Sequence, residues 1–144
     1  MEKMIFKSIL ILLAGMGWIF ANEHGYSSGI QSRTLLKTTT TVTGQPVQYL
    51  KTDSAEVTAL EVEIPPGKET GWHKHPVPAY GYILSGKLTL EVEGRKTLEF
   101  EAGRAFVESM NVMHNGKNMG TEPLKILAFY SGEQGKPITV RKKE

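Results

Sequence analysis

Three histidines are the residues whose type and spacing point most clearly to chemistry. His73 and His75 flank Lys74, and His114 follows about forty residues later. Side chains alternate between the two faces of a strand, so a His-x-His pair on a strand directs both imidazoles to one side. A third imidazole from a neighbouring strand could complete a set around a divalent ion, because imidazole suits Fe, Ni, Cu and Zn. Our first hypothesis is therefore a metal site with His73, His75 and His114 as ligands.

The elements that must position these histidines are short strands. No stretch after about residue 21 shows an apolar repeat at helical spacing, whereas period-2 alternation and β-branched runs recur between Gly and Pro residues. Such a pattern predicts an all-β fold, an antiparallel sandwich or barrel. The expected strands cover Thr38–Thr43, Val57–Ile64, Tyr80–Leu84, Leu88–Val92, Leu98–Phe100, Ala105–Val107, a short stretch around His114, and Leu124–Tyr130.

The beginning of the chain has the pattern of a secretory signal peptide. Lys3 and Lys7 precede an apolar run, Ser8–Ala21, which is shorter than a bilayer span requires. We expect cleavage after Ala21 and export to the periplasm or the medium, with no stable membrane span afterwards. An uncleaved N-terminal anchor is the alternative. The 144 residues then divide into a signal peptide (1–21), a flexible polar leader (22–32) and one β-barrel domain (33–144).

The charge balance of the chain bears on what kind of molecule the protein binds. After loss of residues 1–21, 15 Lys and Arg face 14 Asp and Glu, so the surface is nearly neutral. Such a balance gives no reason to expect nucleic acid as a partner, and a small-molecule ligand or substrate fits better. The chain has no cysteine. The fold must therefore be stabilised by its core, even though an exported protein could form disulfides.

The stretch from about Val57 to Tyr130 resembles the cupins through two motifs. The first, Gly-x5-His-x-His-x3-4-Glu-x6-Gly, begins at Gly67 and ends at Gly86 and includes His73 and His75. The second, Gly-x5-Pro-x-Gly-x2-His-x3-Asn, begins at Gly103 and ends at Asn118, with Ser109 at the proline position, Asn111 at the second glycine and His114 at the histidine. The resemblance implies a double-stranded β-helix, a small jelly-roll barrel whose interior holds a metal bound by three histidines and a glutamate.

One position departs from the family pattern. The acidic residue of the first motif falls on Ala79, which we expect to point inward, with Tyr80 and Tyr82 pointing outward. Three neutral imidazoles without a carboxylate would leave a divalent ion its full charge. Such a site favours an anionic, chelating ligand, and three protein ligands with open positions are the arrangement of catalytic sites. Among the cupins, three-histidine iron sites resemble those of thiol and diketone dioxygenases.

Two carboxylates lie close in sequence to the expected ligands. Glu108 and Glu69 are each a candidate for a substitute ligand, a general base or a residue that orients a ligand, and each is also compatible with a solvated strand end. Asn118 is expected to fix a turn or to hydrogen-bond a neighbouring loop rather than to bind metal. The sequence leaves the ion open among Fe, Mn, Ni, Cu and Zn.

Three functions remain open from the sequence. The first is an exported, metal-dependent oxidoreductase, similar to a dioxygenase, that acts on a small anionic chelating substrate. The second is a non-catalytic cupin that binds or senses a metal or a small ligand. The third is a metal-free barrel that works through a dimer surface. A homodimer is expected in any case, with Thr38–Thr43 able to pair across its interface.

Overall fold

The computed structural model describes residues 25–143. The predicted signal peptide and the first residues of the predicted leader lie outside the described residues. The chain divides into two units, Met1–Arg33 and Thr34–Glu144. In the described part of the first unit, one turn is closed by a hydrogen bond from Ile30 N to Ser27 O (3.3 Å). Between residues 25 and 143, no helix has the length and hydropathy that a membrane crossing requires.

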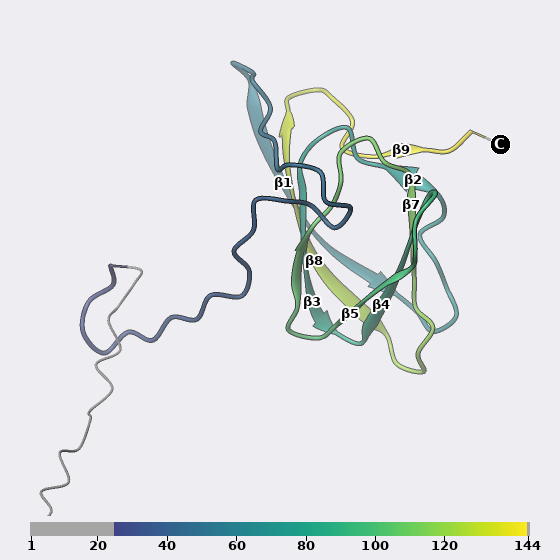
Figure 1. The fold of residues 1–144 in the computed structure, drawn as a ribbon, viewed down its shortest axis with the longest axis horizontal. Coiled ribbons are helices and arrows are strands. Elements are labelled where there is room, and N and C mark those ends of the chain that lie inside the picture. The colour runs from purple at the N-terminus through teal and green to yellow at the C-terminus, as the bar shows by residue number, and fades with distance from the viewer. Residues whose placement is uncertain (1–24, 144) are drawn as a thin grey trace, which may run out of the picture. The chain divides into compact units, whose positions relative to one another are not determined.

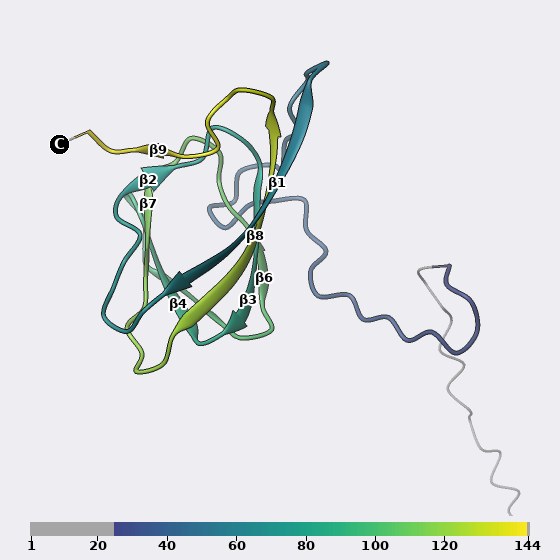
Figure 2. The ribbon, with the colours of Figure 1, turned by 180° about the vertical axis from the view of Figure 1, so that it is seen from behind.

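The second unit is built from strands, in two antiparallel sheets that face each other (Figures 1 and 2). The four-stranded sheet has the order β1-β8-β3-β6, and the five-stranded sheet has the order β5-β4-β7-β2-β9. The strands are β1 (Ala55–Ile64), β2 (His73–Lys74), β3 (Ala79–Ser85), β4 (Lys87–Val92), β5 (Leu98–Glu101), β6 (Ala105–Val107), β7 (His114–Lys117), β8 (Leu124–Glu133) and β9 (Val140–Arg141). No helix occurs within the described residues, so the prediction of an all-β fold is confirmed.

The core lies between the two sheets and follows the period-2 alternation of the strands. In β4, Leu88, Leu90 and Val92 are buried whereas the residues between them are partly exposed. In β3, Ala79 and Ile83 are buried and face β8 across the ladder. Burial of these aliphatic side chains is the main source of stability for a chain without disulfides. The inward direction that we expected for Ala79 is confirmed, because its side chain is only 2% exposed.

The strand predicted for Thr38–Thr43 is wrong. The chain reverses direction at Val42–Thr43, and only a single bridge, between Thr40 and Pro46, joins the two arms. Gly44, with φ of 83°, adopts the left-handed conformation that glycine tolerates best and permits the turn. We call the segment Thr39–Val47 the strap. The strap binds its own barrel, since Val42 N donates to Val107 O (2.8 Å); a homodimer that pairs through this segment stays a prediction.

Two asparagines explain how the second motif keeps its shape. Asn111, at the motif's glycine position, has a φ of 59°, a left-handed conformation that asparagine tolerates better than most residues. Asn118 is 1% exposed. Its Nδ2 donates to Ile64 O and Glu122 O (both 2.8 Å), and its Oδ1 accepts from Gly120 N (3.0 Å). As expected, Asn118 fixes a turn.

Gly81 provides a sharp test of the packing. It lies in β3 opposite Phe106 of β6, and a methyl group at Gly81 would overlap the Phe106 ring, which stacks on Phe100 with ring centroids 4.6 Å apart. Because overpacking a core costs about 1–3 kcal/mol, we expect Gly81→Ala to lower the free energy of unfolding by roughly 2 kcal/mol in urea denaturation. Gly132→Ala in β8 is the control, since the nearest atom would lie 3.6 Å away. Equal stability of the two variants would contradict this packing.

Candidate metal centre

The three predicted histidines come together inside the barrel. His73 in β2 and His114 in β7 are directly paired across the five-stranded sheet. His75 follows β2 and forms a parallel bridge with Met110. One ring nitrogen from each histidine lies within 4.8 Å of the other two, so the three rings could hold a single ion. His75 and His114 are buried, and His73 is partly buried.

Hydrogen bonds to backbone carbonyls fix the tautomer of each ring. Nδ1 of His73 lies 2.7 Å from Gly71 O, and Nδ1 of His75 lies 2.7 Å from Ile138 O. Nδ1 of His114 lies 3.0 Å from Val112 O. Because a carbonyl oxygen only accepts, each Nδ1 must carry the proton and donate it. Each neutral ring therefore keeps an unprotonated Nε2, which is the form that binds a metal.

Glu108 brings a carboxylate to the same place. It follows β6, in the sheet opposite His73 and His114. Its Oε2 lies 3.0 Å from Nε2 of His75 and 3.4 Å from Nε2 of His114. Oε2 of Glu108 and Nε2 of His114 are both buried and neither has a well-formed hydrogen bond. Buried polar atoms without hydrogen bonds are rare in folded proteins, and a cation between these two atoms would provide both with a partner.

The close packing of these ionisable groups shifts their pKa values. Burial lowers the pKa of His73 below its ordinary value, against the opposing effect of its hydrogen bond to Gly71. Burial also opposes the charged form of His75, but the Glu108 carboxylate outweighs it and raises the pKa of His75. Burial opposes ionisation of Glu108 as well, yet the contact with His75 and the positive charge of the histidines hold its pKa below the usual value. Without a metal, a proton on His75 would therefore balance the charge of Glu108.

Tyr130 completes the wall of the site. It lies in β8 opposite Ala79 of β3, and its ring centroid is 5.0 Å from that of His75. Burial and the nearby charge of Glu108 raise the pKa of Tyr130 to about 12, so its phenol stays protonated at neutral pH. A protonated phenol at this distance could donate a hydrogen bond to a bound anion.

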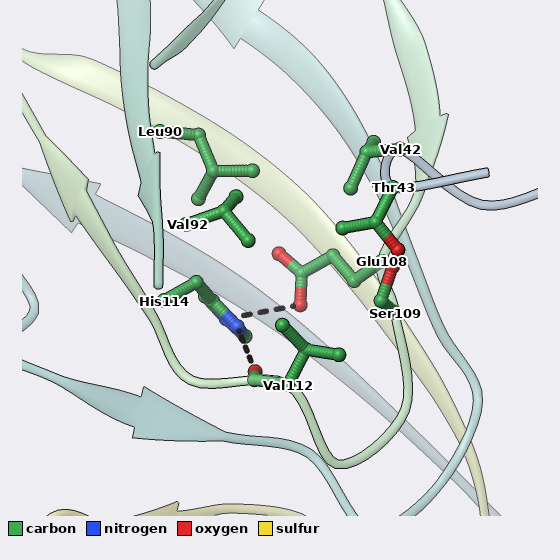
Figure 3. Close-up of a pocket in the computed structure, with 8 residues that line it drawn as sticks. All are labelled: Val42, Thr43, Leu90, Val92, Glu108, Ser109, Val112 and His114. Atoms are coloured by element: carbon green, nitrogen blue, oxygen red, sulfur yellow. Dashed lines mark hydrogen bonds and ion pairs between the residues drawn. The ribbon is translucent and has the colours of Figure 1, made fainter. Parts of the chain in front are cut away.

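A small cavity adjoins Glu108 and His114 (Figure 3). Its volume is about 180 Å³, part of it open to solvent. In the figure, the Glu108 carboxylate and the His114 ring point toward one another, between β4 and the strap. The residues that line the cavity are Val42, Thr43, Leu90, Val92, Glu108, Ser109, Val112 and His114. Four of these eight residues are apolar, and the two ionisable ones, Glu108 and His114, face each other.

Glu69, the other carboxylate that the sequence offered, lies away from this cluster. It is exposed, and its Oε2 is 3.4 Å from Lys117 Nζ, which also contacts Glu91 at 3.0 Å. Glu69 therefore belongs to a surface ion-pair network. Of the two candidates, only Glu108 joins the histidines.

Comparison with known proteins shows the family of the barrel. The family model described as the cupin domain matches residues 60–130, which contain all three histidines and Glu108. The chain contains a cupin domain. The two antiparallel sheets are those of a cupin jelly-roll barrel, and the expected fold is confirmed. No curated protein is similar enough in sequence to match the chain.

Several solved structures share the cupin fold. Oxalate decarboxylase from Lactobacillus farciminis, in complex with formate, is 27% identical with a TM-score of 0.53, covering 59% of this chain and 26% of that one. DMSP lyase DddQ from Ruegeria pomeroyi is 22% identical (TM-score 0.54; 69% and 47% covered). An oxalate oxidase is also 22% identical (TM-score 0.52; 59% and 45% covered). The chain spans less than half the length of each of these proteins.

Sequence reasoning missed several residues that support the cupin site. The acceptor for His75 comes from Ile138, and Thr139 Oγ1 lies 3.2 Å from the same Nδ1. Tyr130 was expected only as the end of a strand. No sequence motif marks these residues. Ile138 contributes only a backbone oxygen, and Tyr130 reaches the site only because β8 lies beside β3. Alternation along β8 places Tyr130 on the inward face with Ala128, and that signal could have pointed to it.

Ser109 connects the strap to the site, and its removal gives a direct test. Its hydroxyl lies 2.7 Å from Thr41 Oγ1 and 2.6 Å from Thr43 Oγ1. Because each such bond contributes about 1 kcal/mol, we expect Ser109→Ala to speed amide hydrogen exchange at Val42 about tenfold or more, measured by NMR. Ser85→Ala removes a surface hydroxyl that bonds Pro123 O, and should leave Val42 unchanged. Unaltered exchange at Val42 in the Ser109 variant would show that other contacts hold the strap.

Proposed function

We propose that this cupin binds one divalent transition-metal ion through His73, His75 and His114. The observation that carries the proposal is the common orientation of the three rings, each with Nδ1 bonded to a carbonyl. One ring nitrogen from each histidine lies within 4.8 Å of the other two. One metal ion can bind all three at once, whereas a single proton cannot serve all of them. The unsatisfied Nε2 of His114 supports the same conclusion.

We further propose that the metal site acts on a small anionic substrate as an oxidoreductase. A bound ion would supply Lewis acidity and open coordination positions. The residues of the chain would supply the surroundings of the ion. Leu90, Val92 and Val112 line the cavity and exclude water, and the ring of Tyr130 lies beside His75. The enclosed part of the cavity has room for about one water molecule, far less than a site for a drug-sized ligand. A substrate of a few heavy atoms fits best.

The similarity to an oxalate decarboxylase, at 27% identity, supports small carboxylates as the first substrates to test. That structure contains formate, a one-carbon carboxylate whose size agrees with the small cavity beside Glu108. β-Diketones and thiols are suggested by the resemblance to dioxygenases. All these compounds present an anionic oxygen or sulfur to a metal.

A binding or sensing function is the second candidate. Thr43 of the strap lines the cavity, and hydrogen bonds to the buried Ser109 hold it there. A strap fixed over a small cavity favours retention of a ligand over rapid exchange of substrate and product. We also propose export, on the basis of the predicted signal peptide; recovery of the protein from the periplasm or medium, with Asn22 as its first residue, would test that step.

Metal content tests the proposed ligands. We expect about one transition-metal ion per chain in the purified protein, and a fall to background in His73→Ala and His114→Ala, measured by elemental analysis. Zn²⁺ added to the metal-free protein at about a hundred times its Kd should stabilise the fold by about 2.7 kcal/mol. Lys74→Ala is the matched control, since Lys74 lies between the two histidines but points to the other face. Unchanged metal content in both histidine variants would end the metal assignment.

Turnover separates the enzyme from the binding module. With the iron- and manganese-loaded proteins, we expect oxygen uptake or CO₂ release from at least one member of a panel of oxalate, small hydroxy acids, β-diketones and thiols, because the site can bind such anions directly. An oxygen electrode and a CO₂ assay measure the two outcomes, with His73→Ala as the inactive control. If no compound reacts while metal and ligands still bind, the enzyme proposal is wrong and the binding function stands.

A further inference from the structure

The carboxylate absent from the first cupin motif has a counterpart directly after the neighbouring strand, β6. Ala79, at the motif position, is 2% exposed and carries no ligand atom. Its backbone oxygen accepts a hydrogen bond from Glu108 N (2.9 Å). Glu108 therefore begins directly beside the position where the motif calls for an acidic residue. From there, the Glu108 side chain reaches His75 and His114.

The distances match those between ligands of one ion. Two donor atoms that are each about 2.1 Å from a metal lie about 3.0 Å apart at a right angle and about 3.4 Å apart at the tetrahedral angle. Glu108 Oε2 lies 3.0 Å from His75 Nε2 and 3.4 Å from His114 Nε2. The carboxylate oxygen thus already stands at ligand separation from two of the three imidazoles.

The side from which Glu108 approaches decides between its possible roles. A carboxylate that orients a metal-bound histidine does so through the N–H on the ring atom that is not bound to metal. Here all three Nδ1 atoms donate to backbone carbonyls, of Gly71, Ile138 and Val112. Glu108 instead faces the Nε2 atoms of His75 and His114. It therefore lies on the metal side of the rings, where it can act as a ligand but not as an orienting residue.

The contacts of Glu108 Oε2 with the two histidine nitrogens are buried, so water cannot screen them. The Glu108 side chain is 17% exposed, and its Oε2 atom is buried without a well-formed hydrogen bond. A buried carboxylate oxygen that faces an unprotonated imidazole nitrogen is repelled unless positive charge lies between them. A proton on Nε2 of His75 can supply that charge for one contact, whereas a divalent ion supplies it for both contacts at once.

We propose that Glu108 is the fourth protein ligand of the metal, supplied after β6 in place of the acidic residue that Ala79 replaces in β3. This inference rests on the proposed metal site. A bound divalent ion would then keep a net charge of about +1 rather than +2, and an octahedral ion would keep about two positions for a substrate. The donor set would hold three nitrogens and one oxygen.

Zn²⁺ binding to the full chain tests the assignment. Starting from metal-free protein, we expect Glu108→Gln to weaken Zn²⁺ binding at least about 100-fold, more than the roughly 10- to 100-fold effect of losing an outer contact to a ligand, as measured by competition with a chelator. Glu69→Gln is the matched control, because it removes the same charge from an exposed side chain, and its Kd should stay within about twofold of the parent. Circular dichroism of each metal-free variant checks that it is folded.

A crystal structure of the unsubstituted protein with Zn²⁺ gives an answer that does not depend on folding of the variant. We expect Glu108 Oε2 within about 2.0–2.2 Å of the ion. Tight, histidine-dependent Zn²⁺ binding with Glu108 beyond bonding distance, or a Glu108→Gln Kd equal to that of Glu69→Gln, would overturn this inference and leave the metal site intact. Absence of any histidine-dependent binding would instead overturn the metal site itself.

Discussion

The candidate site depends on the three hydrogen bonds that hold the imidazole rings from behind. In each histidine, Nδ1–H donates to a backbone carbonyl, which fixes both the rotation of the ring and the position of its proton. For His73 and His114 the acceptor is the carbonyl two residues earlier, so the local chain supplies it. For His75 the acceptor is Ile138, far along the chain. The orientation of His75 therefore requires that the C-terminal segment, which pairs with β2 through β9, be in place.

The barrel explains why such a cluster can be buried. One side of its interior is an apolar core of aliphatic residues from both sheets, and the other holds the histidines, Glu108 and Tyr130. Three imidazoles and a carboxylate brought together without a counter-charge would destabilise the fold, because each loses hydration that only partners can replace. A metal that binds the native state alone compensates for this loss and stabilises the fold by mass action. In the proposed site, metal binding and the stability of the fold would therefore depend on the same four side chains.

Features set by local periodicity could be predicted from the sequence. The expected strands from Val57 to Tyr130, the inward direction of Ala79 and the meeting of the three histidines all result from alternation and from motif spacing. The short strand β9 was not predicted. The strap was not predictable, because β-branched threonines favour an extended chain while the turn depends on hydroxyl contacts with Ser109, 66 and 68 residues away. The acceptor of His75 and the place of Tyr130 likewise depend on which strands become neighbours.

Glu108 shows most clearly why a motif and a site are different things. A motif describes the spacing of residues along one strand. Metal binding depends instead on the positions of the ligand atoms in three dimensions. In an antiparallel sheet, two strands that are distant in sequence place residues side by side, so a ligand lost from β3 can be replaced from the end of β6 without moving the metal. By the first motif alone, the site would lack a carboxylate and a bound ion would keep its full charge; if Glu108 is a ligand, as proposed, it would restore the negative charge that the motif's glutamate supplies. If the proposed ion binds there, access to its open positions would be controlled by the residues that line the adjoining cavity, among them Val42 and Thr43 of the strap.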